Sequence, residues 1–175
     1  MKNIVLASLF LLGFAPLLVN AAPPELQAPS PVIHLADNLD EQDNLGWCID
    51  TLGRGFNEQL HSHSCKPSGG DVQFSYNRET QQIMSVEYAN KCADLSQPAA
   101  SGVSFDLLDC SDSAEQKFVY VADSMEFMPS ADQSLCITAG GASEAAGPYM
   151  SRSLELAPCA STDDSFKQWI VKDGD

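Results

Sequence analysis

Short apolar and β-branched runs recur along the chain from about residue 33, and clusters of Gly, Ser, Asn and Asp separate them. Residues 60–65, 103–108 and 118–121 are the clearest of these strand-like runs. In this part of the chain no stretch sustains the 3.6-residue period of an amphipathic helix. The pattern predicts an all-β domain built from many short strands.

One longer apolar stretch, Ile4–Val19, precedes this region and follows a basic residue. Small residues then allow cleavage by a signal peptidase after Ala21. A membrane-spanning helix is the alternative. However, the stretch is shorter than the roughly 20 apolar residues such a helix needs, and Gly13 and Pro16 interrupt it. We therefore expect residues 1–21 to be a signal peptide and the mature protein to be secreted, or periplasmic, without inserting into a membrane.

Residues 22–32 are rich in proline (AAPPELQAPSP) and predict an extended N-terminal tether. The rest, residues 33–175, is long enough for one domain with a substantial core. The formal net charge of the whole chain is −15, and loss of the leader would remove one further positive charge. This charge repels nucleic acids, anionic lipids and strongly acidic polysaccharides, but it does not oppose the binding of neutral sugars. Most of this charge is explained by a need for solubility.

The chain contains an internal repeat. Three cysteines spaced 44 residues apart each begin a similar phrase: Cys48-Ile49-Asp50, Cys92-Ala93-Asp94 and Cys136-Ile137-Thr138. Three more cysteines follow these after 17, 18 and 23 residues: Cys65, Cys110 and Cys159. A glutamine close to an aromatic residue then completes each unit: Gln73-Phe74, Gln116-Lys117-Phe118 and Gln168-Trp169. The repeats span about residues 33–77, 78–121 and 122–175.

Six cysteines behind an export signal belong to an oxidising compartment, and they allow fifteen pairings. Zinc binding is the competing use, but no C-x-x-C pair is present. Three copies of one unit imply three similar local disulfides: Cys48–Cys65, Cys92–Cys110 and Cys136–Cys159. A single unit cannot bury its apolar face alone. Three units packed about a pseudo-threefold axis can do so, with Phe74, Phe118 and Trp169 as a shared aromatic layer.

A Cys-hydrophobic-Asp phrase, a trailing cysteine and a Gln-x-Trp-like element, repeated three times, resembles the ricin-type (R-type) lectin domain. The resemblance covers about residues 33–171. It implies a β-trefoil with one potential sugar pocket in each repeat. The repeats depart from the family pattern in two respects. Only the second repeat keeps the glutamine two positions before its aromatic residue, and two of the three aromatics are Phe instead of Trp.

In that family a carboxylate in the Cys-x-Asp phrase accepts hydrogen bonds from sugar hydroxyls, and a flat side chain two residues before the trailing cysteine supports the ring. The first repeat fills each role. Asp50 is the expected carboxylate, His63 the platform and His61 a polar partner, and Asp71 stands where an Asn is usual. Two alternatives remain. Asp50 could be a turn residue beside solvated histidines, or His61 and His63 could bind a metal ion, for which no third ligand is evident.

The other two repeats fit less well. The second offers Asp94, Asp106 and Glu115 as polar groups, but Leu108 occupies the platform position, so that Phe105 would have to bend towards the pocket to replace it. In the third repeat the corresponding positions are occupied by Thr138, Ala157 and Phe166, with Glu155 alone remaining. We expect one pocket, or at most two, and a Kd of roughly 0.1–1 mM for a monosaccharide.

The sequence therefore predicts a secreted, non-catalytic protein that binds neutral carbohydrate or glycoconjugates and needs no cofactor or metal. Neither G-x-S-x-G nor H-E-x-x-H is present, and the candidate carboxylates recur one set per repeat, as binding positions do, instead of forming one acid pair for glycoside hydrolysis. The alternative is a protein-binding trefoil, either a protease inhibitor or the targeting subunit of a separate toxin or enzyme. The loop 140–153 could carry inhibition through Arg152, although its Gly and Ala content predicts a flexible loop.

Overall fold

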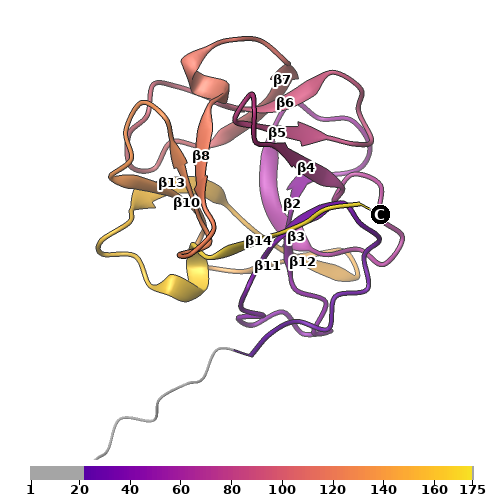
Figure 1. Cartoon of the computed structure of the whole chain (residues 1–175). Helices are drawn as coiled ribbons and strands as arrows, with labels where there is room; N and C mark the ends of the chain where they lie inside the picture. Colours follow the sequence, from indigo (N-terminus) through magenta and orange to yellow (C-terminus); the bar gives the residue numbers. More distant parts are fainter. Residues whose placement is uncertain (1–21, 175) are drawn as a thin grey trace, which may run out of the picture.

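The structure is a computed structural model that describes residues 22–174; the predicted signal peptide lies outside the described residues. The described part contains fourteen β-strands and two short 3-10 helices, so the all-β prediction is confirmed. Three groups of strands surround a common centre (Figure 1). Among residues 22–174, no helix has the length and apolar character needed to cross a membrane.

The strands fall into three consecutive sets. The first set is β1 (Val32–Leu35), β2 (Trp47–Thr51), β3 (Leu60–Ser64) and β4 (Phe74–Asn77). The second set is β5 (Gln82–Ser85), β6 (Lys91–Leu95), β7 (Phe105–Asp109), helix η1 (Ala114–Gln116) and β8 (Phe118–Val121). The third set is β9 (Glu126–Pro129), β10 (Leu135–Ala139), β11 (Glu144–Ala146), β12 (Tyr149–Arg152), β13 (Leu154–Pro158), helix η2 (Asp164–Phe166) and β14 (Trp169–Lys172).

Corresponding strands pair in the same way in the three sets. The strand that contains each phrase cysteine pairs antiparallel with the next core strand, as β2–β3, β6–β7 and β10–β13. The strand that begins with each predicted aromatic residue pairs as β4–β5, β8–β9 and β14–β1. The last of these pairs joins the two ends of the domain, so β1 completes the third set.

The predicted aromatic layer is the centre of the core. Phe74, Phe118 and Trp169 are fully buried and belong to one cluster of apolar side chains. A second repeated feature surrounds them, since Tyr76 Oη donates a hydrogen bond to Phe118 O at 2.7 Å and Tyr120 Oη donates to Trp169 O at 2.9 Å. Each of these tyrosines links its own unit to the next, so the units form one cooperative core.

The three predicted disulfides are present within the repeats: Cys48–Cys65, Cys92–Cys110 and Cys136–Cys159. Their sequence separations of 17, 18 and 23 residues close loops of similar size. By the loop-entropy argument each contributes on the order of 3 kcal/mol to stability. The pairing confirms that the three sets of strands are equivalent units.

Residues 22–31 form no regular strand, but they lie against the domain instead of forming a free tether. Ala28 is buried with Val32 and Val72 around the first disulfide, and Leu26 packs on the same cluster. Gln73 Nε2 donates a hydrogen bond to the carbonyl of Ser30 at 3.2 Å. The segment packs against the domain because it covers apolar surface around the first disulfide that would otherwise be exposed to water.

The long loop of the third repeat is ordered as a hairpin, which corrects the expectation of a flexible loop. Strands β11 and β12 pair with each other, and β12 continues the sheet by pairing with β3 of the first set. The turn between them contains Gly147, whose φ of +67° suits the first position of a two-residue hairpin turn, and then Pro148. The inserted residues therefore build one side of the first repeat.

Candidate functional site

Strands β2 and β3 bring three of the predicted site residues together. Asp50 and His61 lie directly opposite each other in the β2–β3 ladder, and His63 lies two residues further along β3 on the same face. Asp50 Oδ2 is 3.7 Å from His61 Nε2 and 3.6 Å from His63 Nδ1. The convergence of a carboxylate and two imidazoles agrees with the expectation from the sequence.

The carboxylate of Asp50 differs from that expectation in one respect: it is 0% exposed. Lys66 Nζ lies 2.7 Å from Asp50 Oδ2 and also donates to Asp71 Oδ1 at 2.9 Å. Burial opposes the ammonium charge, but the two carboxylates outweigh it and raise the pKa of Lys66 above its ordinary value. The buried carboxylate of Asp50 therefore holds the Lys66 ammonium in place, while Lys66 and Asp71 line the pocket.

A comparison of repeats explains why a lysine occupies this place. In the second repeat the residue two positions before the core aromatic is Gln116, whose Nε2 donates to Asp94 Oδ2 at 2.8 Å. The same position in the first repeat is Val72, which has no polar side-chain atom. Lys66 supplies the missing partner of Asp50 from another direction. The sequence pattern did not single it out because the family pattern gives no role to the residue after the trailing cysteine, although a charged residue directly after Cys65 was a visible signal.

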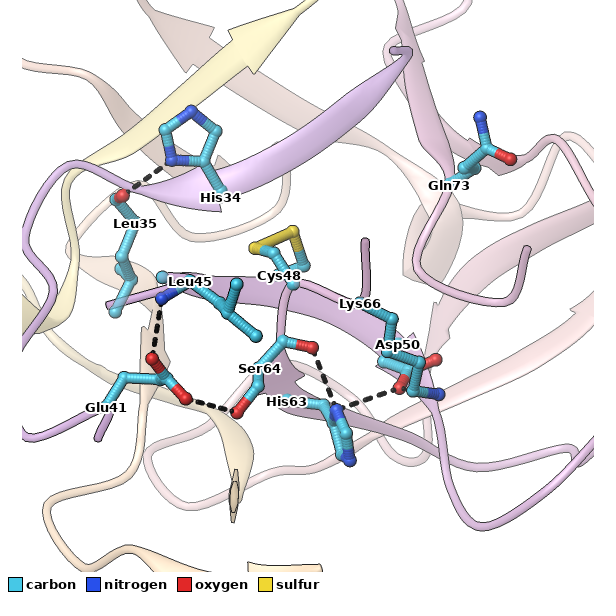
Figure 2. The surroundings of a disulfide bond; sticks show 12 residues. His34, Leu35, Glu41, Leu45, Cys48, Asp50, His63, Ser64, Lys66 and Gln73 are labelled. Carbon is cyan, nitrogen blue, oxygen red and sulfur yellow. Dashed lines mark hydrogen bonds and ion pairs between the residues drawn. A yellow bond between two sulfur atoms is a disulfide. The ribbon is translucent and has the colours of Figure 1, made fainter. Parts of the chain in front are cut away.

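His63 is held as a neutral imidazole. Its Nδ1 donates to the carbonyl of Ser64 at 2.9 Å, since a carbonyl can only accept, and this leaves Nε2 as an acceptor. Burial lowers the pKa of His63; the Ser64 carbonyl and the Asp50 carboxylate oppose that effect, whereas Lys66 adds to it. Figure 2 shows the ring with Nδ1 towards Ser64 and Asp50 and the other nitrogen pointing away from them.

These side chains form the floor of a pocket of about 550 Å³. His61, His63, Lys66 and Asp71 all line it, and the loop 52–55 forms one wall. The turn of the β11–β12 hairpin also lines the pocket, together with Tyr149.

Tyr149 meets His63 edge-on, with ring centroids 5.5 Å apart and an interplanar angle of 67°. The sequence pattern does not predict that Tyr149 belongs to this pocket, because the residue lies 86 positions beyond His63 in the chain and in another repeat. His63 was expected to be the flat platform. In the structure the larger aromatic ring of Tyr149 lies beside His63 in the same pocket.

Buried polar contacts hold the hairpin that carries Tyr149. Glu41 accepts hydrogen bonds from Leu45 N at 2.6 Å and from Ser64 Oγ at 2.9 Å (Figure 2). Ser64 Oγ in turn accepts from Met150 N at 3.0 Å. One carboxylate thus connects the first repeat to the hairpin, next to Tyr149.

Arg152 secures the far end of the hairpin. Its guanidinium pairs with Asp40 and lies over the Trp47 ring, 4.7 Å from the ring centroid. The residue is only 5% exposed. This position contradicts the interpretation of Arg152 as the reactive residue of an inhibitory loop, since a protease pocket could not reach a side chain that is already stacked and paired.

In the second repeat, the predicted residues are differently placed. Asp94 accepts from Gln116, and Asp106 lies opposite it in the β6–β7 ladder. Burial raises the pKa of Asp106, and the Asp94 and Glu58 carboxylates raise it further. Glu115 lies in η1, partly exposed. Phe105, considered as a substitute platform, is 1% exposed in the core and cannot serve.

The third repeat has its polar positions occupied internally. Thr138 Oγ1 donates to the carbonyl of Glu155 at 3.0 Å, and the Glu155 carboxylate accepts from Ser153 Oγ at 3.1 Å. Lys167, at the position of Gln116, donates to Cys159 O and pairs with Glu126. No group of three or more His, Cys, Asp or Glu side chains suited to a metal ion occurs within residues 22–174.

Three equivalent strand units closed by the β1–β14 pair define a β-trefoil, and the predicted fold is confirmed by comparison with solved structures. No protein-family profile and no curated protein matches the sequence.

The chain is similar over 83% of its length to the agglutinin from Abrus precatorius (TM-score 0.58, 13% identity, 47% of that chain). It is similar over 82% to the β-trefoil lectin of the Vibrio vulnificus hemolysin/cytolysin with N-acetyl-D-lactosamine bound (TM-score 0.55, 11% identity, 93% of that chain). Over 86% it is similar to GalNAc-T7 with UDP, GalNAc and Mn2+ (TM-score 0.56, 16% identity), of which it spans only 23%.

Proposed function

We propose that this protein is a non-catalytic carbohydrate-binding protein and that the pocket of the first repeat is its binding site. The observation that carries the proposal is the arrangement at this pocket, where an ammonium, a carboxylate and a neutral imidazole line one hollow beside an aromatic ring. Two of the similar structures described above are named as an agglutinin and a lectin, which supports the same class of function.

The polar groups match the chemistry of a sugar. A sugar hydroxyl both donates and accepts, so it needs partners of both kinds close together. Lys66 Nζ is a donor, and Asp71 and His63 Nε2 are acceptors. Tyr149 offers a ring on which the apolar face of a pyranose can pack. In this scheme Asp50 contacts no sugar. It fixes the two histidines and Lys66, and this revises the direct role that the sequence suggested.

The charge balance of the pocket favours a neutral ligand. Lys66 lies between two carboxylates, so an added sugar carboxylate would compete with Asp50 and Asp71 for the same ammonium. The net charge of −15 further repels anionic glycans. Under this proposal the second repeat contributes little binding, because Asp94 is occupied by Gln116 and the ring expected from Phe105 is buried.

Titration calorimetry and ligand-observed NMR with galactose, N-acetylgalactosamine and N-acetyllactosamine test the proposal. We expect Kd values in the range of about 0.1–1 mM for a monosaccharide that binds. Asp71→Asn should weaken binding at least tenfold, because an amide is a poorer acceptor than a carboxylate. Asp109→Asn, which alters an exposed carboxylate of the second repeat, is the matched control. Absence of binding to a full neutral glycan array, or equal binding by both variants, would contradict the proposal.

We also propose that the chain acts outside the cytoplasm. Its three disulfides persist in an oxidising compartment, and the sequence predicts a leader ending at Ala21. N-terminal sequencing of the protein recovered from the medium or periplasm should begin at Ala22. Recovery of the uncleaved chain from the cytoplasm would refute export.

A further inference from the structure

A second hollow adjoins the candidate pocket. It has a volume of about 470 Å³ and shares Leu52, His61 and Ser151 with the pocket as common lining. Beyond this shared wall it is bounded by the start of the hairpin, including Gly141 and Glu144. The two hollows therefore form one groove that passes over His61 and Ser151.

The second hollow exists because of the β11–β12 hairpin. Strand β12 extends the sheet beside β3, with Ser151 opposite His63. The two core aromatics that follow the second and third phrases are 51 residues apart, against 44 for the first pair, and the extra length is this hairpin. The groove is therefore built by the first and third repeats together.

We propose that the groove binds a neutral oligosaccharide of at least two residues, with one ring in the first-repeat pocket and the next in the adjoining hollow. This inference rests on the proposed function and adds the length of the ligand to it. Each hollow falls within the 300–1,000 Å³ typical of small-molecule sites.

Two features of the groove support an extended ligand. His61 lines both hollows and is only 8% exposed; its Nε2 is buried 3.7 Å from Asp50 Oδ2, so the rest of the ring forms the boundary between them. Glu144 brings an exposed carboxylate to the second hollow, which suits hydroxyl donors and disfavours an acidic sugar. A ligand crossing the boundary would pass directly over His61.

The groove can be blocked at one end without touching the other. A Cβ built at Gly141 has no heavy atom within 4 Å, so Gly141→Trp can be accommodated while its ring fills part of the second hollow. Ala142→Trp is an independent blocking variant on the same loop. Ala100→Trp places the same side chain on an exposed turn of the second repeat, outside both hollows, and serves as the control.

The experiment measures Kd by calorimetry for neutral glycans of one to four residues, including galactose, N-acetylgalactosamine and N-acetyllactosamine. We expect the best oligosaccharide to bind at least fivefold more tightly than its best single constituent sugar. Gly141→Trp and Ala142→Trp should each remove that advantage and leave the monosaccharide Kd unchanged, whereas Ala100→Trp should retain it.

Backbone NMR gives a second measure. The oligosaccharide should shift the amides of residues 141–144 as well as those near His63, and the monosaccharide only the latter. Equal affinities for monosaccharides and oligosaccharides, or blocked variants that retain the advantage, would overturn the two-ring groove while leaving the carbohydrate site intact. Absence of binding by any glycan would instead overturn the proposed function.

Discussion

Lys66 Nζ lies 2.7 Å from the fully buried Oδ2 of Asp50, and this pair forms the base of the candidate pocket. A carboxylate without exposure needs a partner, because leaving a charge unpaired in the interior is costly. Here the partner comes from the residue that follows the first trailing cysteine. The disulfide Cys48–Cys65 thus fixes the backbone on both sides of the ion pair, since Asp50 and Lys66 each lie within two residues of one of its cysteines.

Removal of Lys66 should destabilise the protein. Lys66→Met leaves Asp50 as an unpaired buried anion, and we expect the free energy of unfolding to fall by about 3 kcal/mol. Urea unfolding at pH 7.5 measures the loss. The double variant Lys66→Met with Asp50→Asn should recover most of it, because it removes both charges. Equal loss in the single and double variants would show that the lysine stabilises by packing alone.

Tyr149 should govern affinity through its ring and not through its hydroxyl. Tyr149→Ala should weaken sugar binding at least tenfold, equivalent to about 1.4 kcal/mol, whereas Tyr149→Phe should change it less than twofold. Calorimetry with the glycan that binds the wild type makes this comparison. Phe56→Ala, which truncates an exposed ring outside the pocket, is the control. A large loss of affinity in Tyr149→Phe would instead show that the hydroxyl group makes the main contact.

Stability should fall as the pH is lowered through about 6.5. Burial lowers the pKa values of His34 and His63, so below the unfolded value of about 6.5 the unfolded chain binds protons that the folded chain does not. Above that pH both states are neutral and the effect vanishes. The loss grows until the folded pKa values are reached, and amounts to at most about 1.4 kcal/mol for each histidine at pH 5.5.

Urea midpoints at pH 7.5 and 5.5 give the size of this effect. Both pH values lie above the pKa of ordinary carboxyl groups, so these groups stay ionised in the comparison. A variant with His34→Gln and His63→Gln should show a smaller difference between the two midpoints. If the double variant kept the full pH dependence, the histidines would not be its source.

Arg152 should be needed for the order of the hairpin. Arg152→Met removes the pair with Asp40 and the cation–π contact with Trp47, both of which hold β12 in place. Hydrogen exchange of residues 144–152 should accelerate at least tenfold, while the β6–β7 hairpin remains unchanged. Uniform acceleration across the domain would indicate global destabilisation instead of local release.

The repeat made the fold predictable, because three cysteine phrases in register resemble the ricin-type lectin domain, and that resemblance implied a β-trefoil. Short apolar runs between turn residues located the strands: residues 60–65, 103–108 and 118–121 were expected, and β3, β7 and β8 occupy nearly the same positions. The convergence of Asp50, His61 and His63 followed from the two-residue period of a strand.

Contacts between repeats could not be predicted in this way. Tyr149 reaches the first repeat because β12 pairs with β3, and no local pattern encodes a pairing between strands some 90 residues apart. The Gly and Ala content of residues 140–153 suggested flexibility, since composition does not show that Arg152 and Met150 are anchored. The ion pair between Asp50 and Lys66 was missed for a similar reason, because only the folded arrangement brings the two residues together.

The pairing of β1 with β14 means that the first strand of the domain is also the last piece of its ring. A protease that cut between Leu35 and Trp47 and released the N-terminal piece would leave Trp169–Lys172 with a row of unsatisfied amides and carbonyls. Such a bare strand is a template for association with other chains. Integrity of the few residues before position 36 would then decide whether the protein remains monodisperse, which size-exclusion chromatography after limited digestion would reveal.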